Sequence, residues 1–163
     1  MDRKIKGFNM FEILVILVII GILMGLAIRP LLVLIANQRL NVAVNMLVSD
    51  LNDAKMYSIS KNSLMGITGD RDGNSYITFI NKDNNCSYDP STDEVVKNMT
   101  LPSGIVFEND IFFLFDRKGF PRNAICGLGM GNIKLKNTFN TIKTICIDRY
   151  GRIKVLHGDM SCI

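Results

Sequence analysis

An almost unbroken apolar run near the N-terminus dominates the hydrophobic pattern of the chain. Residues 13–28 are uncharged and almost wholly aliphatic. The apolar zone extends over residues 8–11 before this run and residues 31–36 after it, and it approaches the roughly 20 residues that cross a bilayer. The pattern predicts one membrane-spanning helix.

A second helical pattern follows the apolar run. Apolar residues repeat at spacings of four, three, four and three, which places them on one face of a helix. Pro30 lacks an amide donor and can interrupt a helix, but the pattern resumes directly after it. We therefore expect one long helix that continues to about residue 62, with its apolar stripe packed on a globular part. The stripe consists of Leu40, Val44, Leu47, Leu51 and Ala54.

Beyond residue 62 the pattern changes to short β-rich runs separated by turn residues. Turn signals include Asp72-Gly73-Asn74, Pro102-Ser103-Gly104 and Tyr150-Gly151, and residues 82–92 form a polar, loop-like segment. The expected fold class is α+β, in which a long N-terminal helix packs on an antiparallel β-sheet. The predicted strands are residues 64–68, 75–80, 94–99, 105–108, 111–115, 133–136, 141–148 and 152–156.

The charge is distributed unevenly along the chain. Its 163 residues suffice for one globular domain with a core and a short non-globular segment. Of the net charge of +4, residues 1–7 contribute +2, residues 37–110 contribute −4 and residues 111–163 contribute +6. We therefore expect a polarised molecule with a basic C-terminal part.

Four cysteines, at positions 86, 126, 146 and 162, follow the apolar run. None forms a CxxC pair and His157 is the only histidine, so the usual ligand spacing of a metal site is missing. An even number of cysteines in an exported domain favours disulfides, with three connectivities, over buried thiols. A bond between Cys146 and Cys162 would pin the C-terminal tail and leave Cys86 to pair with Cys126, and a non-reducing peptide map tests this hypothesis.

Two other motifs are only weak evidence for a ligand site. Asp70-x-Asp72-x-Asn74 begins like a calcium loop but lacks the glycine and glutamate positions of an EF-hand. Gly127-x-Gly129-x-Gly131 lacks the spacing of a phosphate-binding loop. A single histidine gives no credible catalytic set, so we expect neither an enzyme nor a cofactor.

Three interpretations compete for the N-terminus. A secretory signal peptide needs a small-x-small cleavage site after its apolar core, but Ile28, Arg29 and Pro30 stand there. A plain membrane anchor fits the length, and the basic residues 3, 4 and 6 would keep its N-terminus cytoplasmic. Neither interpretation gives Glu12 a role, although a carboxylate beside a membrane helix costs free energy. The alternative is that Glu12 only lies where the helix meets the membrane–water interface.

The third interpretation rests on residues 6–15, KGFNMFEILV, which resemble the prepilin signature of type IV pilins and type II secretion pseudopilins. Residues 19–23 resemble the Ile-Ile-Gly-Ile-Leu stretch of the same family. The resemblance implies that a prepilin peptidase cuts between Gly7 and Phe8, that Phe8 is then N-methylated, and that Glu12 is the glutamate at the fifth mature position. Asn9 departs from the common Thr or Ser, and Pro30 falls one residue later than usual.

Glu12 would then set the register of subunits. In a filament core that is nearly free of water, a lone carboxylate is expensive, so it would pair with the N-terminal amine of a neighbouring subunit. The implied division is a leader at 1–7, a transmembrane and filament-core helix at 8–36, and a periplasmic head at 37–163. The head would consist of a helix at about 37–62 and a β-rich part at 63–163.

Later segments resemble the GspH/FimT group of minor pilins and pseudopilins. These segments are residues 36–40, Ser49-Asp50-Leu51 with Ala54, Phe115-Asp116-Arg117-Lys118-Gly119 and residues 147–155. The resemblance implies an inner-membrane, single-pass subunit that later enters a pilus or a periplasmic pseudopilus. Its partners would be other pilins or pseudopilins, the prepilin peptidase and the inner-membrane assembly platform.

The basic C-terminal part contains a candidate patch. It could bind DNA phosphates non-specifically, as some members of this group are thought to do during uptake. Alternatively, it docks the acidic half of a neighbouring subunit or is a solvated face. The patch consists of Arg117, Lys118, Lys143, Arg149, Arg152 and Lys154.

Three functions therefore stay open. The chain is a minor pilin of a type IV pilus, a GspH-like minor pseudopilin of a type II secretion system, or a single-pass anchor or sensor without a filament role. Residues alone do not separate the first two.

Overall fold

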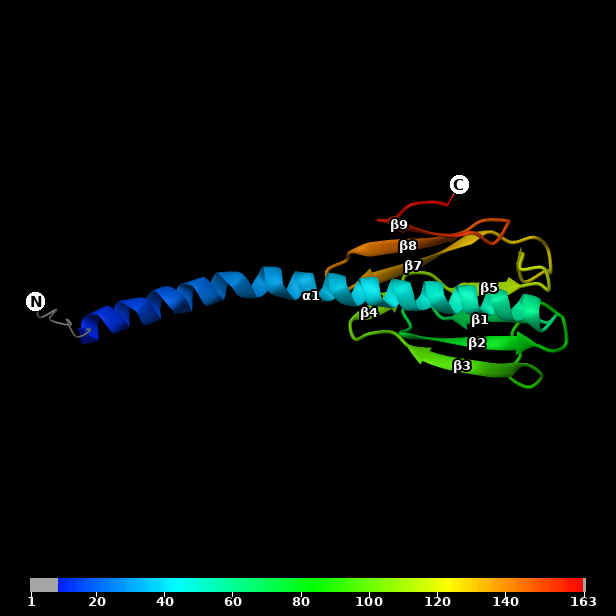
Figure 1. Ribbon diagram of the computed structural model, residues 1–163, viewed down its shortest axis with the longest axis horizontal. Helices are drawn as coiled ribbons and strands as arrows, with labels where there is room; N and C mark the ends of the chain where they lie inside the picture. The colour runs from blue at the N-terminus through cyan, green and yellow to red at the C-terminus, as the bar shows by residue number, and fades with distance from the viewer. Residues whose placement is uncertain (1–8, 163) are drawn as a thin grey trace, which may run out of the picture. The chain divides into compact units, whose positions relative to one another are not determined.

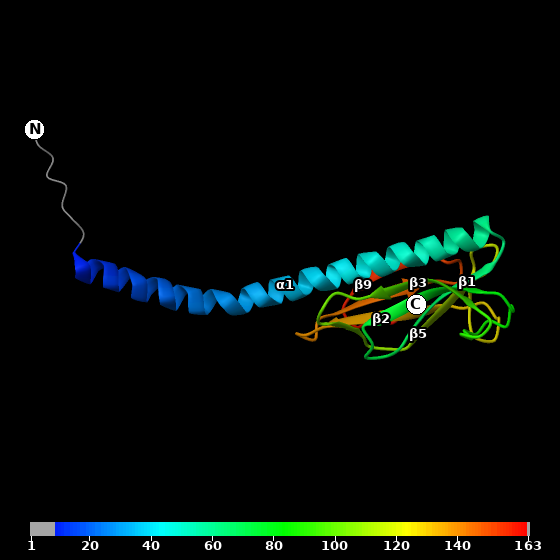
Figure 2. The same cartoon turned by 90° about the horizontal axis from the view of Figure 1, so that it is seen from below.

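The computed structural model describes residues 9–162, which contain one α-helix and nine β-strands (Figures 1 and 2). The helix, α1, spans Met10–Ser60. Asn9 caps its start, because the amide of Phe11 donates to Asn9 Oδ1 at 3.3 Å. Asn62, at a left-handed φ of 52°, follows its end, as is common after helices. Cleavage at Gly7 and methylation of Phe8 concern residues outside the described range.

Pro30 lies inside α1, and the helix runs through it without interruption. The single long helix expected from the sequence is therefore present. Pro30 does not break it. The chain divides into two compact units, Met1–Ile35 and Ala36–Ile163. We call the second unit the head.

The strands of the head form two antiparallel sheets. The first has the order β3-β2-β1-β5-β6 and the second has the order β4-β7-β8-β9. The strands of the first sheet are β1 (Leu64–Gly69), β2 (Ser75–Asn81), β3 (Glu94–Thr100), β5 (Ile111–Phe115) and β6 (Pro121–Arg122). The strands of the second are β4 (Ile105–Phe107), β7 (Gly131–Asn137), β8 (Ile142–Ile147) and β9 (Ile153–His157).

The α+β class and every predicted strand are confirmed, with ends that differ from the prediction by at most two residues. Two features differ from the expectation. The strands divide into two sheets, because β4 pairs with β7 instead of continuing the first sheet. The two-residue strand β6 pairs with β5 and was not predicted, since two residues carry no alternating pattern.

The core of the head lies between α1 and the two sheets. All five residues of the predicted helical stripe are buried. They join one apolar cluster with residues of both sheets, among them Ile67 and Phe115 from the first and Ile133 and Ile145 from the second. Full burial of an aliphatic or phenylalanine side chain contributes about 1.5–3 kcal/mol, so this stripe attaches the helix to both sheets.

A buried polar cluster also joins α1 to the first sheet. Asp50, on the buried side of α1, accepts a hydrogen bond from the hydroxyl of Tyr76 on β2. It also accepts one from Lys97 Nζ on β3 at 2.6 Å. Burial and then the Asp50 carboxylate raise the pKa of Tyr76 well above its ordinary value, so the hydroxyl stays protonated and donates.

Candidate functional site

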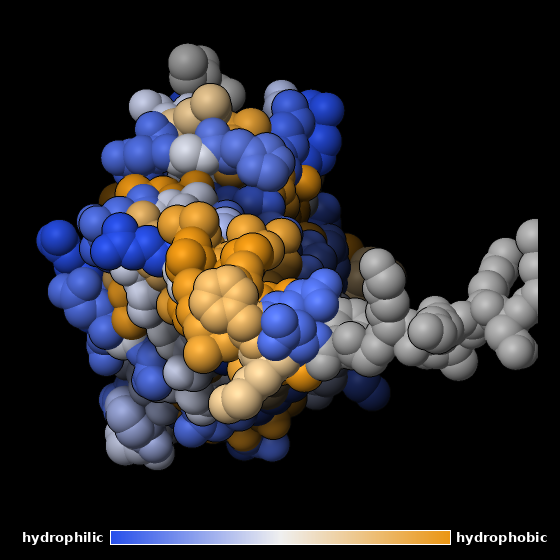
Figure 3. All heavy atoms as spheres, turned by 90° about the vertical axis from the view of Figure 1, so that its left-hand side faces the viewer, coloured by the Kyte–Doolittle hydropathy of each residue, from blue (hydrophilic) through white to orange (hydrophobic). Residues whose placement is uncertain are grey.

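The first half of α1 exposes a long aliphatic surface. Every described residue from Met10 to Leu34 is exposed, including Leu17 and Leu26. Figure 3 shows apolar side chains gathered over this part of the helix. By length and composition α1 could cross a membrane, a criterion that a signal sequence near the N-terminus also satisfies. Exposed apolar surface on this scale is typical of segments that contact lipid or other proteins.

Glu12 lies in the first turn of this helix. A negative charge there is favourable, because the unpaired amides at a helix start carry partial positive charge. Glu12 is exposed, and the residues that follow it up to Ile28 carry no charge. The structure thus places one carboxylate at the start of an uncharged helical surface.

The candidate basic patch is built mainly on two hairpin turns. The first, residues 116–120, is called here the Asp116 turn. The amide of Asp116 donates to the Phe120 carbonyl at 2.9 Å, and Gly119 donates to the Asp116 carbonyl at 2.8 Å. Oδ1 of Asp116 accepts from the amides of Lys118 and Phe120, both at 2.9 Å. Gly119 has a φ of +79°, a conformation that glycine adopts without strain.

The second turn, residues 148–152, repeats this arrangement and is called the Asp148 turn. The amide of Asp148 donates to the Arg152 carbonyl at 3.1 Å, and Gly151 donates to the Asp148 carbonyl at 2.9 Å. Oδ1 of Asp148 accepts from the amides of Tyr150 and Arg152, both at 2.9 Å. Gly151 has a φ of +71°. Both turns read Asp-Arg-x-Gly in the sequence.

The two turns meet at Lys55 of α1, where the two sheets come together. Lys55 Nζ donates to the carbonyl of Gly151 at 2.8 Å. A Cβ placed on Gly119 would lie 3.1 Å from Lys55 Cε, and one placed on Gly151 would lie 2.6 Å from the carbonyl oxygen of Gly119. The glycines therefore allow a close contact between turns from different sheets.

Both aspartates are held in the ionised form. Burial alone would raise the pKa of Asp116, but the amides of Phe120 and Lys118 and the guanidinium of Arg122 outweigh it, so the pKa is lowered. For Asp148, the amide of Arg152 is the largest cause of a lowered pKa. Arg122 donates to Asp116 Oδ2 at 2.6 Å and Arg152 to Asp148 Oδ2 at 3.0 Å. Each aspartate is thus neutralised by one arginine.

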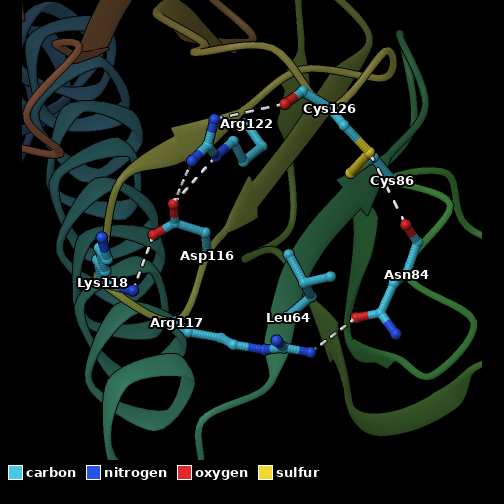
Figure 4. Close-up of a pocket in the computed structure, with 8 residues that line it drawn as sticks. All are labelled: Leu64, Asn84, Cys86, Asp116, Arg117, Lys118, Arg122 and Cys126. Carbon is cyan, nitrogen blue, oxygen red and sulfur yellow. Dashed lines mark hydrogen bonds and ion pairs between the residues drawn. A yellow bond between two sulfur atoms is a disulfide. The ribbon is translucent and has the colours of Figure 1, made fainter.

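This pairing leaves the other cations of the turns uncompensated. Within the described residues no ion pair involves Arg117, Lys118, Arg149 or Lys154. In Figure 4, Arg122 and Asp116 point toward each other, whereas Arg117 points toward Asn84. Arg117 and Lys118 line a surface hollow of about 500 Å³ beside Cys86 and Cys126, and Lys118 and Arg149 line a second hollow of about 390 Å³ that contains Tyr150.

The structure does not bring every predicted member of the patch together. Lys118 and Arg149 line the same hollow, and Arg149, Arg152 and Lys154 share another. Lys143 pairs with His157 at the other end of β8, about 13 Å from Ile147 at 3.3 Å per residue. Lys143 therefore lies apart, and Arg122, which was not predicted, belongs to the surface. The two Asp-Arg-x-Gly segments were the signal that could have indicated paired turns.

Two disulfides stand beside this surface. Cys86 is bonded to Cys126, and Cys146 is bonded to Cys162, which are the pairs named in the sequence hypothesis. The first ties the loop after β2 to the loop after β6, and the second holds the segment after β9 against β8. Among residues 9–162, no three His, Cys, Asp or Glu side chains are placed to hold a metal ion.

The chain was compared with known proteins in three ways. No protein-family model, no curated protein and no solved structure matches it.

Proposed function

We propose that the chain is a minor subunit of a type IV pilus or a related filament, made as a precursor and assembled through its N-terminal helix. The observation that carries the proposal is the combination of the prepilin-like segment with a helix whose first turn holds Glu12 and whose next residues are uncharged and exposed. Such a surface needs an apolar environment. The membrane would supply it before assembly, and other subunits would supply it afterwards.

The head fits the same proposal. Its half of α1 is buried against two sheets by the apolar stripe and by Asp50. The same helix, Met10–Ser60, supplies both the exposed apolar segment and the segment packed in the head, so one element would serve both the filament core and the folded head. The head would lie in the periplasm and the N-terminus in the cytoplasm, as the basic leader favours.

Two alternatives use the same residues. A GspH-like minor pseudopilin of a type II secretion system would need the same leader, helix and Glu12. A single-pass anchor or sensor would need the helix alone. Deleting the gene separates the first two, because loss of surface pili indicates the pilus and loss of protein secretion indicates the secretion system.

The proposal is tested by the N-terminus of the mature chain. Mass spectrometry should find a chain that begins at N-methylated Phe8 in cells with the prepilin peptidase and an uncut chain in cells without it. Gly7→Val should block the cut, because a side chain would obstruct the scissile bond. Asn9→Ser, which keeps a helix-capping residue, serves as the matched control and should be cut normally. A chain that keeps residues 1–7 in the presence of the peptidase would leave only the anchor interpretation.

A second candidate activity is contact with DNA phosphates. It is supported by the uncompensated cations of the Asp116 and Asp148 turns. Such contacts would be non-specific and strongly salt-dependent.

A further inference from the structure

The two flanks of the head differ in charge. On one flank lie the helix residues 50–53, β3 and the loop before β3, which carry six acidic residues against Lys82 and Lys97. Asp50 and Asp93 are buried and Glu94 pairs with Lys82, so the acidic surface of this flank comes from Asp53, Asp83 and Asp89. On the other flank lie β8, the Asp148 turn and β9, where residues 142–157 carry four basic residues against Asp148. Figure 1 shows β3 and β9 on opposite sides of α1. One head therefore cannot bring its own flanks together.

The acidic flank contains a small hollow between α1 and β3, of about 190 Å³. Asp53 and Tyr57 of α1 line it, and Val96 and Lys97 of β3 face them. Asp53 is exposed and makes no ion pair among the described residues. Val96 is 46% exposed although it is aliphatic. The hollow thus offers an apolar wall with an unpaired carboxylate at its rim.

The basic flank presents a projecting aromatic side chain. Tyr150 is 68% exposed at the tip of the Asp148 turn. The turn is closed by its own hydrogen bonds, and the guanidinium of Arg152 lies over the Tyr150 ring at 5.9 Å. Arg149 stands beside it without an ion pair in the described chain. Tyrosine and arginine held in a fixed geometry are typical of the residues that dominate protein interfaces.

The Asp148 turn and the hollow lie at the same level of α1. Gly151, next to Tyr150, contacts Lys55, and the hollow is lined by Asp53 and Tyr57. A second head placed beside the first could therefore present its Asp148 turn to the hollow without a large shift along the helix. A contact between two different surfaces of identical chains joins two neighbouring copies and leaves one surface of each kind free for a further subunit.

We propose that the Asp148 turn of one copy docks in the α1–β3 hollow of a second copy, with Tyr150 against Val96 and Tyr57 and with Arg149 near Asp53. This inference rests on the proposed assembly function and names a head contact within it. Charge complementarity favours a second copy over DNA, because the chain itself carries the acidic surface that the basic turn needs. The contact is distinct from pairing through Glu12, which belongs to the other unit of the chain.

Photocrosslinking of the full-length chain tests the contact. The chain is reconstituted alone in phosphatidylcholine vesicles, with Tyr150 replaced by p-benzoylphenylalanine. Irradiation should yield a covalent dimer, and mass spectrometry should locate the cross-link in residues 50–57 or 94–100 of the second copy. No dimer, or cross-links only to other segments, would overturn the proposal.

Charge swaps supply the matched controls. Arg149→Glu and Asp53→Arg should each lower the dimer yield about tenfold, because each puts like charges together. The double variant should restore the yield, since every contact between copies then has opposite charges again, and this rescue also shows that the single changes do not unfold the head. Failure of the rescue would refute the Arg149–Asp53 pairing.

Two further outcomes keep this contact separable from other interpretations. If Arg149→Glu abolishes binding of a DNA duplex but leaves the dimer yield unchanged, the turn is a nucleic-acid surface and the proposal is wrong. Cutting at Gly7 is measured separately in cells. A chain that is cut normally but gives no dimer refutes only the head contact, whereas an uncut chain that gives the dimer refutes only the filament function.

Discussion

Gly119 and Gly151 lie against each other at the junction between the two sheets, and a Cβ on Gly151 would stand 2.6 Å from the carbonyl oxygen of Gly119. Each glycine follows an Asp-Arg pair in a turn of the same hydrogen-bond pattern. The basic side chains of the two turns are neighbours on the surface because these backbones touch. The packing of the fold and the charge of the candidate surface thus depend on the same contact.

Gly151→Ala should therefore destabilise the head strongly. A left-handed backbone costs a non-glycine residue about 1–2 kcal/mol, and overpacking against the Gly119 carbonyl adds about 1–3 kcal/mol. Urea unfolding of the full chain in detergent measures the loss. Gly158→Ala is the control, since Gly158 has a φ of +91° but nothing within 4 Å of an added Cβ. Equal losses for the two variants would show that the contact between turns contributes nothing.

Asp116→Asn should weaken the head at neutral pH and flatten its response to acid. The pKa of Asp116 is lowered in the folded chain from its ordinary 3.8, so the folded state favours the ionised form. That contribution is present above about pH 3.8 and is lost as the pH falls through the lower, folded pKa. Urea midpoints at pH 7, 5 and 3 should differ between wild type and variant at pH 7 and converge toward pH 3.

The hydrogen bonds that close the Asp116 turn should be kept in Asp116→Asn. Asn123 and Asn137 occupy the same position in two other turns of the head, and their Oδ1 atoms accept amide hydrogen bonds as Asp116 does. Asn can therefore keep the turn closed while losing the attraction to Arg122. Asp53→Asn, at an exposed carboxylate, is the control and should not change the midpoints. A constant gap between wild type and Asp116→Asn at all three pH values would rule out a charge effect.

Asp50→Ala should lower the free energy of unfolding by more than the lost packing of the Asp50 side chain accounts for. The reason is that it leaves the buried Tyr76 hydroxyl without its acceptor. An unsatisfied buried hydroxyl costs about 1–3 kcal/mol. Tyr76→Phe removes that hydroxyl, so the double variant should recover part of the loss. A double-mutant cycle in urea measures the coupling. Strictly additive losses would show that the hydrogen bond between these two residues does not stabilise the head.

Much of the fold followed from periodicity. The stripe from Leu40 to Ala54 was predictable because a helix with one buried face repeats its apolar residues every three or four positions. The strand positions were predictable for the analogous reason, with period two. The division into two sheets was not, since the pairing of β1 with β5 and of β4 with β7 joins segments far apart in sequence. Local patterns carry no information on such partners.

The candidate surface was predicted less well, for two physical reasons. Lys143 was grouped with Arg149 by sequence proximity, although a strand between them separates its ends by about 3.3 Å per residue. Arg122 was missed because its position depends on the Asp116 turn, which folds it back onto the aspartate. Asp50, in contrast, could have been noticed as an acidic residue one turn from Leu47 on an otherwise apolar face.

DNA binding should depend on the basic side chains of the Asp116 and Asp148 turns and not on the net charge of the chain. Arg149→Glu should weaken binding of the full chain in detergent to a duplex. It should also reduce the slope of log K against log salt by about 0.9 for each phosphate that the variant no longer neutralises. Lys143→Glu changes the net charge equally at the far end of β8 and is the control. Fluorescence anisotropy over a salt series measures both the affinity for the duplex and the salt slope. Equal effects of the two variants would indicate only a general attraction to a basic protein.

Glu12→Gln should block assembly while leaving insertion into the membrane intact. Glutamine keeps the size of the side chain and its place in the first turn of α1, and only the charge is removed. In the filament the amine of the mature N-terminus would then be left unpaired in apolar surroundings, and breaking one side of a buried pair costs about 3–5 kcal/mol. Sheared filaments should therefore contain far less of the variant than of wild type, with equal amounts of both in the membrane fraction. Leu14→Ala, two residues further along the exposed helix, changes a neighbouring side chain without removing a charge, so it is the control and should assemble. A Glu12→Gln chain that enters filaments as well as wild type would refute the role of this carboxylate in setting the register of subunits.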